Sequence, residues 1–251
     1  MLLWSRVDGK EPNTQSDTGR PTPISEITGR SDVIGLAFRM NGKPLPADHD
    51  APVRALVPGW CGGVSTKWLT EIKIASHDFW VRLNTTDRAN IGPAYPTAAW
   101  SPNDEFCFAS PKNILGVPVT WHGPRSFLTV PLMLSKQPVL PPNYPLARDE
   151  MPVMKGGGQV LRGYASAPES GVARVDVRVK GGGWQAARLT DPVINAYTWA
   201  RFEVPLDALA GDYLVETQTT AVNGDVQTPT VPYNAGGYDC WAFPRFKIRF
   251  A

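Results

Sequence analysis

Two short segments carry side chains of the kind that can bind an anion. His49 and Arg54 lie in the segment HDAPVR, and Lys67 follows Ser65 and Thr66 after a pair of glycines. Arginine and lysine form charge-assisted hydrogen bonds to phosphates, and glycines let the backbone come close to a ligand. On residue type alone, a surface histidine in a turn and solvated cations explain the same residues at least as well.

The other reactive residue types form no recognisable site. The remaining histidines, His77 and His122, match no motif, and no nucleophile elbow or phosphate loop is present. Three cysteines have neither metal-type spacing nor an even count: Cys61, Cys107 and Cys240. We therefore expect free thiols and no zinc site.

The bulk composition excludes several classes of function. The chain has 251 residues, of which 42% are hydrophobic and 19% charged, and a net charge of +2. This balance predicts no nucleic-acid partner. No apolar run reaches the roughly 18 residues of a membrane span, and the apolar start is too short for a secretory signal. The 25 prolines and 23 glycines indicate short strands joined by many turns.

The elements that must position the candidate residues are short. Residues 1–32 are rich in turn formers and predict a loop or an extended arm. Strands or short buried segments are expected at 33–38, 53–57 and 68–74, on either side of the candidate residues. Residues 84–126 are rich in proline and predict a long irregular stretch.

A change of pattern near residue 136 predicts a domain boundary. The segment 136–152 is rich in proline and is typical of a semi-rigid linker. In 172–179 apolar and charged residues alternate, which predicts a strand with Ala173 and the following valines on its buried face. A glycine turn and a return strand at 184–189 would complete a hairpin. Further strands are expected at 201–206, 212–219 and 243–251, so an immunoglobulin-like sandwich is the predicted fold of this part.

Residues 39–74 closely resemble the sulfite oxidase family. There, the sequence RMNGKPLPADHDAPVRALVPGWCGGVSTKWLTEIKI follows the family pattern NGxPLPxxHGxPxR and then VPGWxGxxxVKWLxxI. Residues 172–189 and 221–242 resemble two later segments of the family. The resemblance implies an α+β, mostly β fold: a partial, mixed α/β molybdopterin-binding domain over 1–135 and an immunoglobulin-like dimerisation domain over 136–251.

The resemblance also implies chemistry and partners. The cofactor would be molybdenum–molybdopterin, and the reaction a two-electron oxidation of sulfite or related sulfur or nitrate chemistry. A small anionic sulfur substrate and a homodimer formed through the C-terminal domain are expected, whereas the electron acceptor is not identified. Members are often periplasmic or exported. The positions that match the family's cofactor contacts are His49, Arg54, Ser65, Thr66 and Lys67.

Two departures from the family pattern concern catalysis. The family's molybdenum-ligating cysteine lies well upstream, and Cys61 does not match it, so no metal ligand and no catalytic residue is assigned. In 79–89 Thr85 stands where the family has an active-site tyrosine, and Tyr95 would replace it only if the loop folds back. We therefore expect a chain that is incomplete and inactive without an N-terminal half.

A second hypothesis is a non-catalytic dimerisation or interaction module derived from such an enzyme. It predicts an ordered dimer that contains no metal, whereas the enzymatic hypothesis predicts bound molybdenum. Four aromatic residues are candidates either for a dimer face or, more favoured, for the core of the sandwich: Tyr197, Trp199, Trp241 and Phe243.

Overall fold

The chain forms two compact units that alternate along the sequence. The computed structural model describes residues 2–5, 18–76, 79–80, 89–95, 105–106, 116–131, 152–191 and 194–251. The first unit comprises Met1–Trp121 and Pro232–Asp239, and the second comprises His122–Val231 and Cys240–Ala251. The linker expected at 136–152 lies, apart from Pro152, outside the described residues. A domain division at 135/136 therefore stays a prediction.

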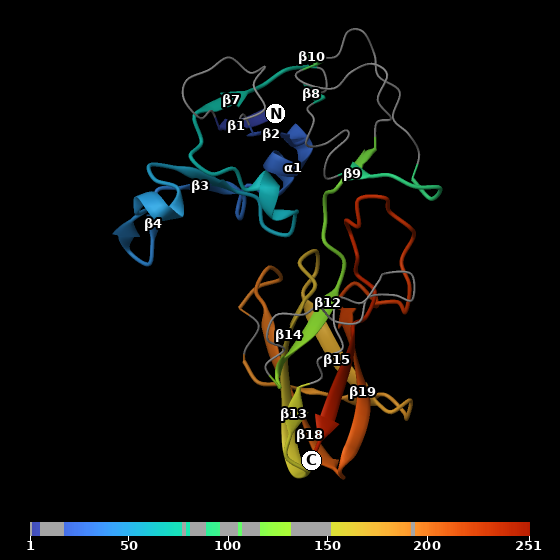
Figure 1. Ribbon diagram of the computed structural model, residues 1–251. Coiled ribbons are helices and arrows are strands. Elements are labelled where there is room, and N and C mark those ends of the chain that lie inside the picture. Colours follow the sequence, from blue (N-terminus) through green and yellow to red (C-terminus); the bar gives the residue numbers. More distant parts are fainter. Residues whose placement is uncertain are drawn as a thin grey trace. The chain divides into compact units, whose positions relative to one another are not determined.

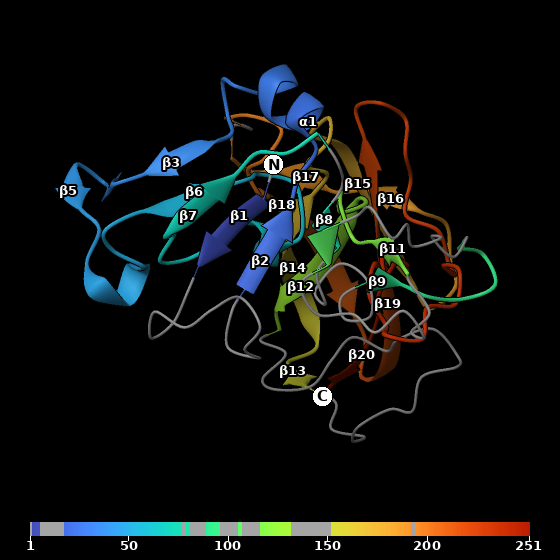
Figure 2. The same cartoon turned by 90° about the horizontal axis from the view of Figure 1, so that it is seen from above.

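The beginning of the chain is more regular than its composition indicates. Strand β1 (Leu2–Ser5) pairs antiparallel with both β2 (Thr18–Pro21) and β7 (Glu71–Lys73), and Figure 2 shows the three side by side. A short helix, α1 (Ile24–Gly29), follows β2. The expectation of a loop or an extended arm over 1–32 is wrong for these paired strands and for the helix. The reason is that β1 is completed by β7, a strand far away in the sequence, which local composition does not reveal.

The rest of the first unit consists of short strand pairs and two 3-10 helices. The pairs are β3 (Gly35–Ala37) with β6 (Arg54–Leu56), β4 (Arg39–Met40) with β5 (Lys43–Pro44), β8 (Phe79–Trp80) with β10 (Glu105–Phe106), and β9 (Ala89–Asn90) with β11 (Val117–Pro118). The 3-10 helices are η1 (Ala47–His49) and η2 (Gly62–Val64). Shortened forms of the strands expected at 33–38, 53–57 and 68–74 are thus present.

A small apolar core holds the loops around β6 and η2. It contains five buried side chains: Ala55, Val57, Trp60, Val64 and Leu69. The ring of Trp60 meets that of Trp121 edge to face, with centroids 6.5 Å apart. Such aromatic contacts add to the free energy gained from apolar burial. This apolar core therefore holds in place the candidate segments that lie before and after β6.

A late segment of the chain, 232–239, belongs to the first unit. The side-chain amide of buried Asn234 donates to Asn90 Oδ1 at 2.5 Å, and Asn90 donates to Asp239 Oδ2 at 2.7 Å. A Cβ atom on Gly92 would lie 2.3 Å from the carbonyl oxygen of Tyr233, so only glycine fits there. These contacts fasten the late segment to β9.

The second unit is a sandwich of two sheets, drawn from green to red in Figure 1. The four-stranded sheet has the order β12 (Arg125–Val130), β14 (Gly157–Ser166), β18 (Ala200–Ala208) and β17 (Arg188–Leu189). The five-stranded sheet has the order β13 (Val153–Met154), β20 (Arg245–Phe250), β19 (Gly211–Ala221), β15 (Val172–Val179) and β16 (Gln185–Ala186).

Both sheets contribute to one apolar core. Leu161 and Phe202 come from the four-stranded sheet, and Val175 and Ile248 come from the five-stranded sheet; all four are fully buried. Two sheets that bury one face each against a common core are the definition of a sandwich. The expected fold class, mostly β with a β-sandwich, is confirmed.

The strand 172–179 is where the sequence predicted it, but its first residues face the other way. Val172 is buried and Ala173 is exposed, the reverse of the simple alternation. The pairing register with β19 shifts between Val172 and Arg174. A β-bulge inserts one extra residue and changes the face of the residues beyond it, so the two-residue period fails at this end.

The predicted hairpin forms only in part. After the glycine turn, only Gln185 and Ala186 pair antiparallel with β15. Arg188 and Leu189 then pair with β18 in the opposite sheet. The return segment therefore switches sheets, as strands at the corners of sandwiches do.

Buried polar side chains join the two sheets through Gln227, which is 1% exposed. Its Oε1 accepts hydrogen bonds from Ser126 Oγ at 2.7 Å and from the backbone N–H of Thr219 at 2.9 Å. Ser126 lies on β12 and Thr219 on β19. A buried amide that is satisfied in this way fixes the relative register of the sheets.

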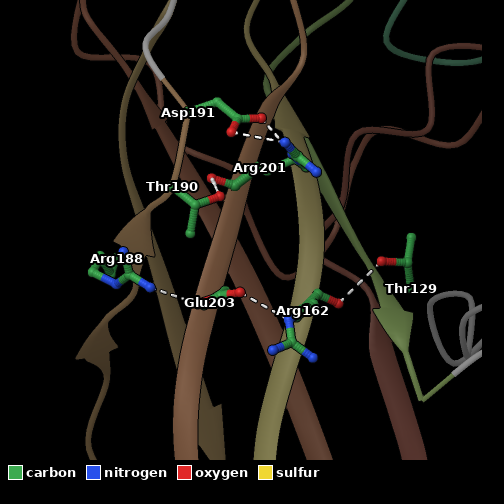
Figure 3. Close-up of polar contacts among 7 residues, drawn as sticks. All are labelled: Thr129, Arg162, Arg188, Thr190, Asp191, Arg201 and Glu203. Atoms are coloured by element: carbon green, nitrogen blue, oxygen red, sulfur yellow. Dashed lines mark hydrogen bonds and ion pairs between the residues drawn. The ribbon is translucent and has the colours of Figure 1, made fainter.

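The outer face of the four-stranded sheet carries a ladder of ion pairs (Figure 3). Glu203 accepts from Arg162 at 2.8 Å and from Arg188 at 2.6 Å. Arg201 donates from Nε and from Nη2 to the two carboxylate oxygens of Asp191. The pairs are solvent-exposed, and each contributes little to stability. They nevertheless mark a face on which both signs of charge alternate.

On the five-stranded sheet, Glu216 also accepts hydrogen bonds from two arginines, as Glu203 does on the other sheet, but Glu216 is buried. Glu216 is 4% exposed and accepts from Arg178 at 2.5 Å and from Arg245 at 3.1 Å. Burial raises the pKa of Glu216, but the hydrogen bonds from Arg178 and Arg245 outweigh it and hold the pKa below its ordinary value. The two sheets thus offer the same arrangement in a buried and an exposed setting.

Of the four aromatic candidates, Phe243 lies in the core and Trp199 on the surface. Phe243 is 7% exposed and meets Trp184 edge to face at 5.4 Å. Trp199 is 47% exposed and packs against Phe127 at 5.4 Å. The core interpretation is therefore correct for Phe243, and Trp199 stays available as a surface residue.

Candidate functional site

The first candidate segment turns sharply after η1. His49 ends this 3-10 helix and is exposed. Asp50 caps the helix in the left-handed conformation, with φ of 74°, and its backbone N–H donates to the carbonyl oxygen of Ala47. Aspartate tolerates this conformation better than most residues. The turn directs the carboxylate of Asp50 inward, where the residue is only 1% exposed.

Arg54 stands at the start of β6 and meets this carboxylate. Its Nη1 lies 2.8 Å from Asp50 Oδ2, and its side chain is 25% exposed. Its Nε is buried and has no hydrogen-bond partner among the described residues. A buried guanidinium donor without an acceptor is costly, and an anionic ligand would satisfy it.

Ser65 and Thr66 are used within the loop itself. The Oγ of Ser65 accepts from the backbone N–H of Val57 at 3.0 Å. The hydroxyl of buried Thr66 donates to the carbonyl oxygen of Val64 at 3.4 Å, and the carbonyl oxygen of Thr66 accepts from Ala55. These bonds fasten the loop after η2 to β6. The two side chains therefore shape the loop that presents Lys67.

Lys67 extends from this loop toward the same carboxylate. Its Nζ lies 3.7 Å from Asp50 Oδ1, and its side chain is 58% exposed. The ammonium also lies 5.8 Å from the ring centroid of Trp68, which is 48% exposed and has a φ of 45°. The structure thus brings Arg54 and Lys67 together around Asp50, with His49 next to Asp50 in the chain.

These residues fit a phosphate-bearing cofactor of the kind that the resemblance implies. Lys67 and His49 present donors to solvent, and the buried Nε of Arg54 has no acceptor among the described residues. Arginine and lysine are the side chains used most for phosphate recognition. The arrangement can bind and orient an anion.

Asp50 is the residue that sequence reasoning missed. It lies between His49 and Arg54, where the family pattern HGxPxR has glycine. The sequence does contain a signal for Asp50, because a charged residue replaces the glycine that the family has at this left-handed turn. Its significance depends on the folding of Lys67 onto the same carboxylate, which the sequence pattern does not show.

The remaining sequence candidates do not form a second site. Trp60 lies in the core, and the thiol of half-buried Cys61 donates to the carbonyl oxygen of Val119 at 3.5 Å. Burial, aided by the carboxylate of Asp239, raises the pKa of half-buried Tyr95. Thr85, Cys107 and His77 lie outside the described residues.

His122, in the second unit, titrates far from its ordinary range. Burial, and to a smaller extent the charge of Arg125, lowers its pKa to about 4. Its Nδ1 is buried without a hydrogen-bond partner among the described residues. The side chain is therefore neutral at pH 7.

The described parts of the chain contain neither a cluster of metal-binding side chains nor a membrane-spanning helix. No group of three or more His, Cys, Asp or Glu side chains is placed to hold a metal ion. No helix there is long and apolar enough to cross a membrane.

Comparisons with known proteins connect these observations. Residues 2–80 match the family profile described as oxidoreductase molybdopterin binding domain. The match begins well upstream of residue 39, the first residue of the resemblance found in the sequence, and includes β1 and β2.

Two curated relatives align with most of the chain. Mitochondrial sulfite oxidase from Homo sapiens is 29% identical over 220 residues, which cover 85% of this chain and 35% of that protein. Inducible NADH nitrate reductase 1 from Glycine max is 31% identical over 223 residues, covering 84% of this chain and 23% of that protein. The chain thus spans about a third or less of the length of these relatives.

A solved structure shares the fold. The sulfane dehydrogenase SoxCD from Paracoccus pantotrophus superposes with a TM-score of 0.71 at 20% identity. The similarity covers 100% of this chain and 57% of that chain.

Proposed function

Because the chain belongs to the sulfite oxidase family of molybdopterin oxidoreductases, we propose that its first unit binds the anionic part of molybdenum–molybdopterin. The observation that carries this proposal is the convergence of Arg54, at the start of β6, and Lys67, in the loop after η2, around one position. Two cations that already lie close together in the folded chain form an anion site at a smaller cost in ordering.

Each residue has a distinct part in this proposal. Arg54 donates from its unsatisfied Nε and its guanidinium edge to the phosphate. Lys67 adds a mobile positive charge, and His49 a further donor at the rim. Ser65 and Thr66 act through the loop they stabilise. The bound cofactor would supply the two-electron redox chemistry.

The proposed reaction is the oxidation of sulfite or a related small sulfur anion. The similarity to human sulfite oxidase supports sulfur chemistry, and the similarity to soybean nitrate reductase supports nitrate as the alternative. The described residues include no match to the family's metal-ligating cysteine or active-site tyrosine. Oxidation of the substrate would therefore require a molybdenum-ligating thiolate from outside the residues that the structure describes.

Cofactor content tests the proposal directly. The protein is produced in a host that makes molybdopterin, and pterin is measured by fluorescence after oxidative release, with molybdenum measured by mass spectrometry. We expect stoichiometric pterin in the wild type and its loss in the double variant Arg54→Gln, Lys67→Gln. Lys43→Gln, at an exposed lysine of the same unit, is the matched control and should retain pterin. Wild-type protein without pterin would refute the proposal.

We also propose that the second unit forms a homodimer through the outer face of its four-stranded sheet. A two-fold interface must be complementary to itself. The alternating arginines and carboxylates of Figure 3 meet this condition, and Phe127 and half-exposed Trp199 add aromatic surface beside them. The same face would serve a non-catalytic dimerisation module, the alternative function.

Sedimentation velocity tests the dimer and its face. Arg188→Glu changes the charge of a side chain that is 71% exposed on this face and should shift the protein toward monomer. Lys247→Glu, at an exposed position of the other sheet, should leave the sedimentation coefficient unchanged. A wild-type monomer at high concentration would refute the dimer, and equal effects of both variants would refute the choice of face.

A further inference from the structure

The candidate cation pair already has an anion, supplied by the chain itself. Asp50 is 1% exposed, and its two carboxylate oxygens face different cations: Oδ2 faces Arg54 at 2.8 Å and Oδ1 faces Lys67 at 3.7 Å. Only the first distance is that of a hydrogen bond, and Oδ1 has no hydrogen-bond partner among the described residues. The carboxylate thus neutralises one of the two positive charges without having both of its oxygens satisfied.

The backbone at this position does not require a charge. Asp50 adopts a left-handed φ of 74° after a 3-10 helix, and glycine or asparagine satisfies that geometry equally well. The buried carboxylate is therefore a separable feature of this turn. Its effect on the neighbouring cations is electrostatic, and it can be removed while the turn is kept.

A second anion at the same cations would experience this charge. An anion that bonds to the free edge of the same guanidinium lies within about 5 to 7 Å of the Asp50 carboxylate. Two like charges at such a distance repel each other appreciably at the effective dielectric of a protein surface. The three side chains together offer a net charge of +1, whereas Arg54 and Lys67 alone would offer +2.

We infer that Asp50 is an internal counter-anion that competes with the phosphate-bearing ligand for Arg54 and Lys67 and so limits the affinity of this site. This inference rests on the proposed function in its choice of ligand class. On ligand binding, Lys67, which is held by the longer contact, leaves Asp50 first and turns toward the incoming anion. Arg54 keeps Asp50 on one edge and uses its buried Nε on the other.

The experiment measures the binding of inorganic phosphate to the purified chain by calorimetry at low ionic strength. We expect Asp50→Asn and Asp50→Gly to bind phosphate about tenfold more tightly than the wild type, because one repelling charge is removed. Asp48→Asn is the matched control. It removes the same charge from the same 3-10 helix at an exposed position, and its affinity should stay within about twofold of the wild type.

Further variants test whether phosphate binds at Arg54 and Lys67 and whether the turn is preserved. Adding Arg54→Gln and Lys67→Gln to Asp50→Asn should abolish the gain, which places phosphate at this pair. Near-ultraviolet circular dichroism verifies that the variants are folded, and Asp50→Gly preserves the turn if asparagine disturbs it. Unchanged or weaker binding in both folded Asp50 variants would overturn the inference, since Asp50 would then position the cations or play no part.

The inference and the proposed function fail separately. Tighter phosphate binding in the Asp50 variants, combined with wild-type protein that never contains pterin, would leave the competition intact and refute the cofactor. Stoichiometric pterin in the wild type, combined with no gain in the Asp50 variants, would retain the cofactor and refute the competition.

Discussion

Replacing Glu216 by glutamine should destabilise the second unit by about 2 kcal/mol at pH 7. Glu216 is buried and accepts charge-assisted hydrogen bonds from Arg178 and Arg245. Each such bond contributes about 1.5 to 3 kcal/mol when it is well shielded. The side chains of the two arginines are 28% and 26% exposed, so solvent screens part of this contribution. Glutamine also keeps one oxygen acceptor, which reduces the loss further.

The pH dependence of this loss has a definite sign. The folded protein holds the pKa of Glu216 below its ordinary value of 4.5. A carboxyl group with a depressed pKa stabilises the folded state above 4.5, and that contribution disappears as pH falls through the lowered pKa. Because the glutamine variant lacks the contribution at every pH, its difference from the wild type should shrink below pH 4.5.

Denaturant unfolding at several pH values, followed by circular dichroism, measures both effects. The control is Glu203→Gln, which breaks an equivalent pair of arginine contacts on the exposed face of the other sheet. It should cost clearly less than Glu216→Gln because water already screens those contacts. Equal losses in the two variants, or a loss at Glu216 that persists unchanged in acid, would refute this electrostatic reasoning.

Three further predictions concern the packing and titration of the second unit. Gln227→Leu should lower the free energy of unfolding by about 2 kcal/mol, because the buried N–H of Thr219 loses its acceptor; urea titration measures this. Gly163→Ala should lose about 1 to 3 kcal/mol through overpacking, since its Cβ would lie 2.3 Å from a backbone carbonyl oxygen, whereas Gly158→Ala, with open space around it, should be nearly neutral in the same titration. His122, with its pKa lowered from 6.5 to about 4, binds fewer protons when folded, so stability should fall by about 2 kcal/mol as pH drops from 6.5 to 4; a His122→Gln variant that keeps this slope would contradict the assignment.

The sequence predicts the second unit better than the first. Alternating residues in 172–179 indicate a sandwich strand because one face is apolar, and the structure has that strand with the predicted bounds. The error at Ala173 has a local cause, since a β-bulge is not encoded in the two-residue period. In contrast, β1 depends on β7, its partner about 70 residues later, and composition alone gave a loop.

The candidate site was predictable as a set of residues but not as an arrangement. The resemblance selected Arg54 and Lys67, which the structure brings to one carboxylate. It also selected Ser65 and Thr66, whose side chains the structure uses inside their own loop. Asp50 was overlooked because pattern matching gives weight to the positions that agree, whereas the electrostatics of a site depend equally on those that do not.

The assignment of 232–239 to the first unit has a consequence for dissecting the molecule. The polypeptide passes between the units three times, after residues 121, 231 and 239. A single cut after Trp121 would therefore deprive the N-terminal piece of Asn234 and leave the amide and carbonyl of Asn90 without their partners. Separating the two units intact requires a permuted gene that joins the late segment to the early one, and shortening the chain from its C-terminal end as far as Pro232 would remove residues of both units.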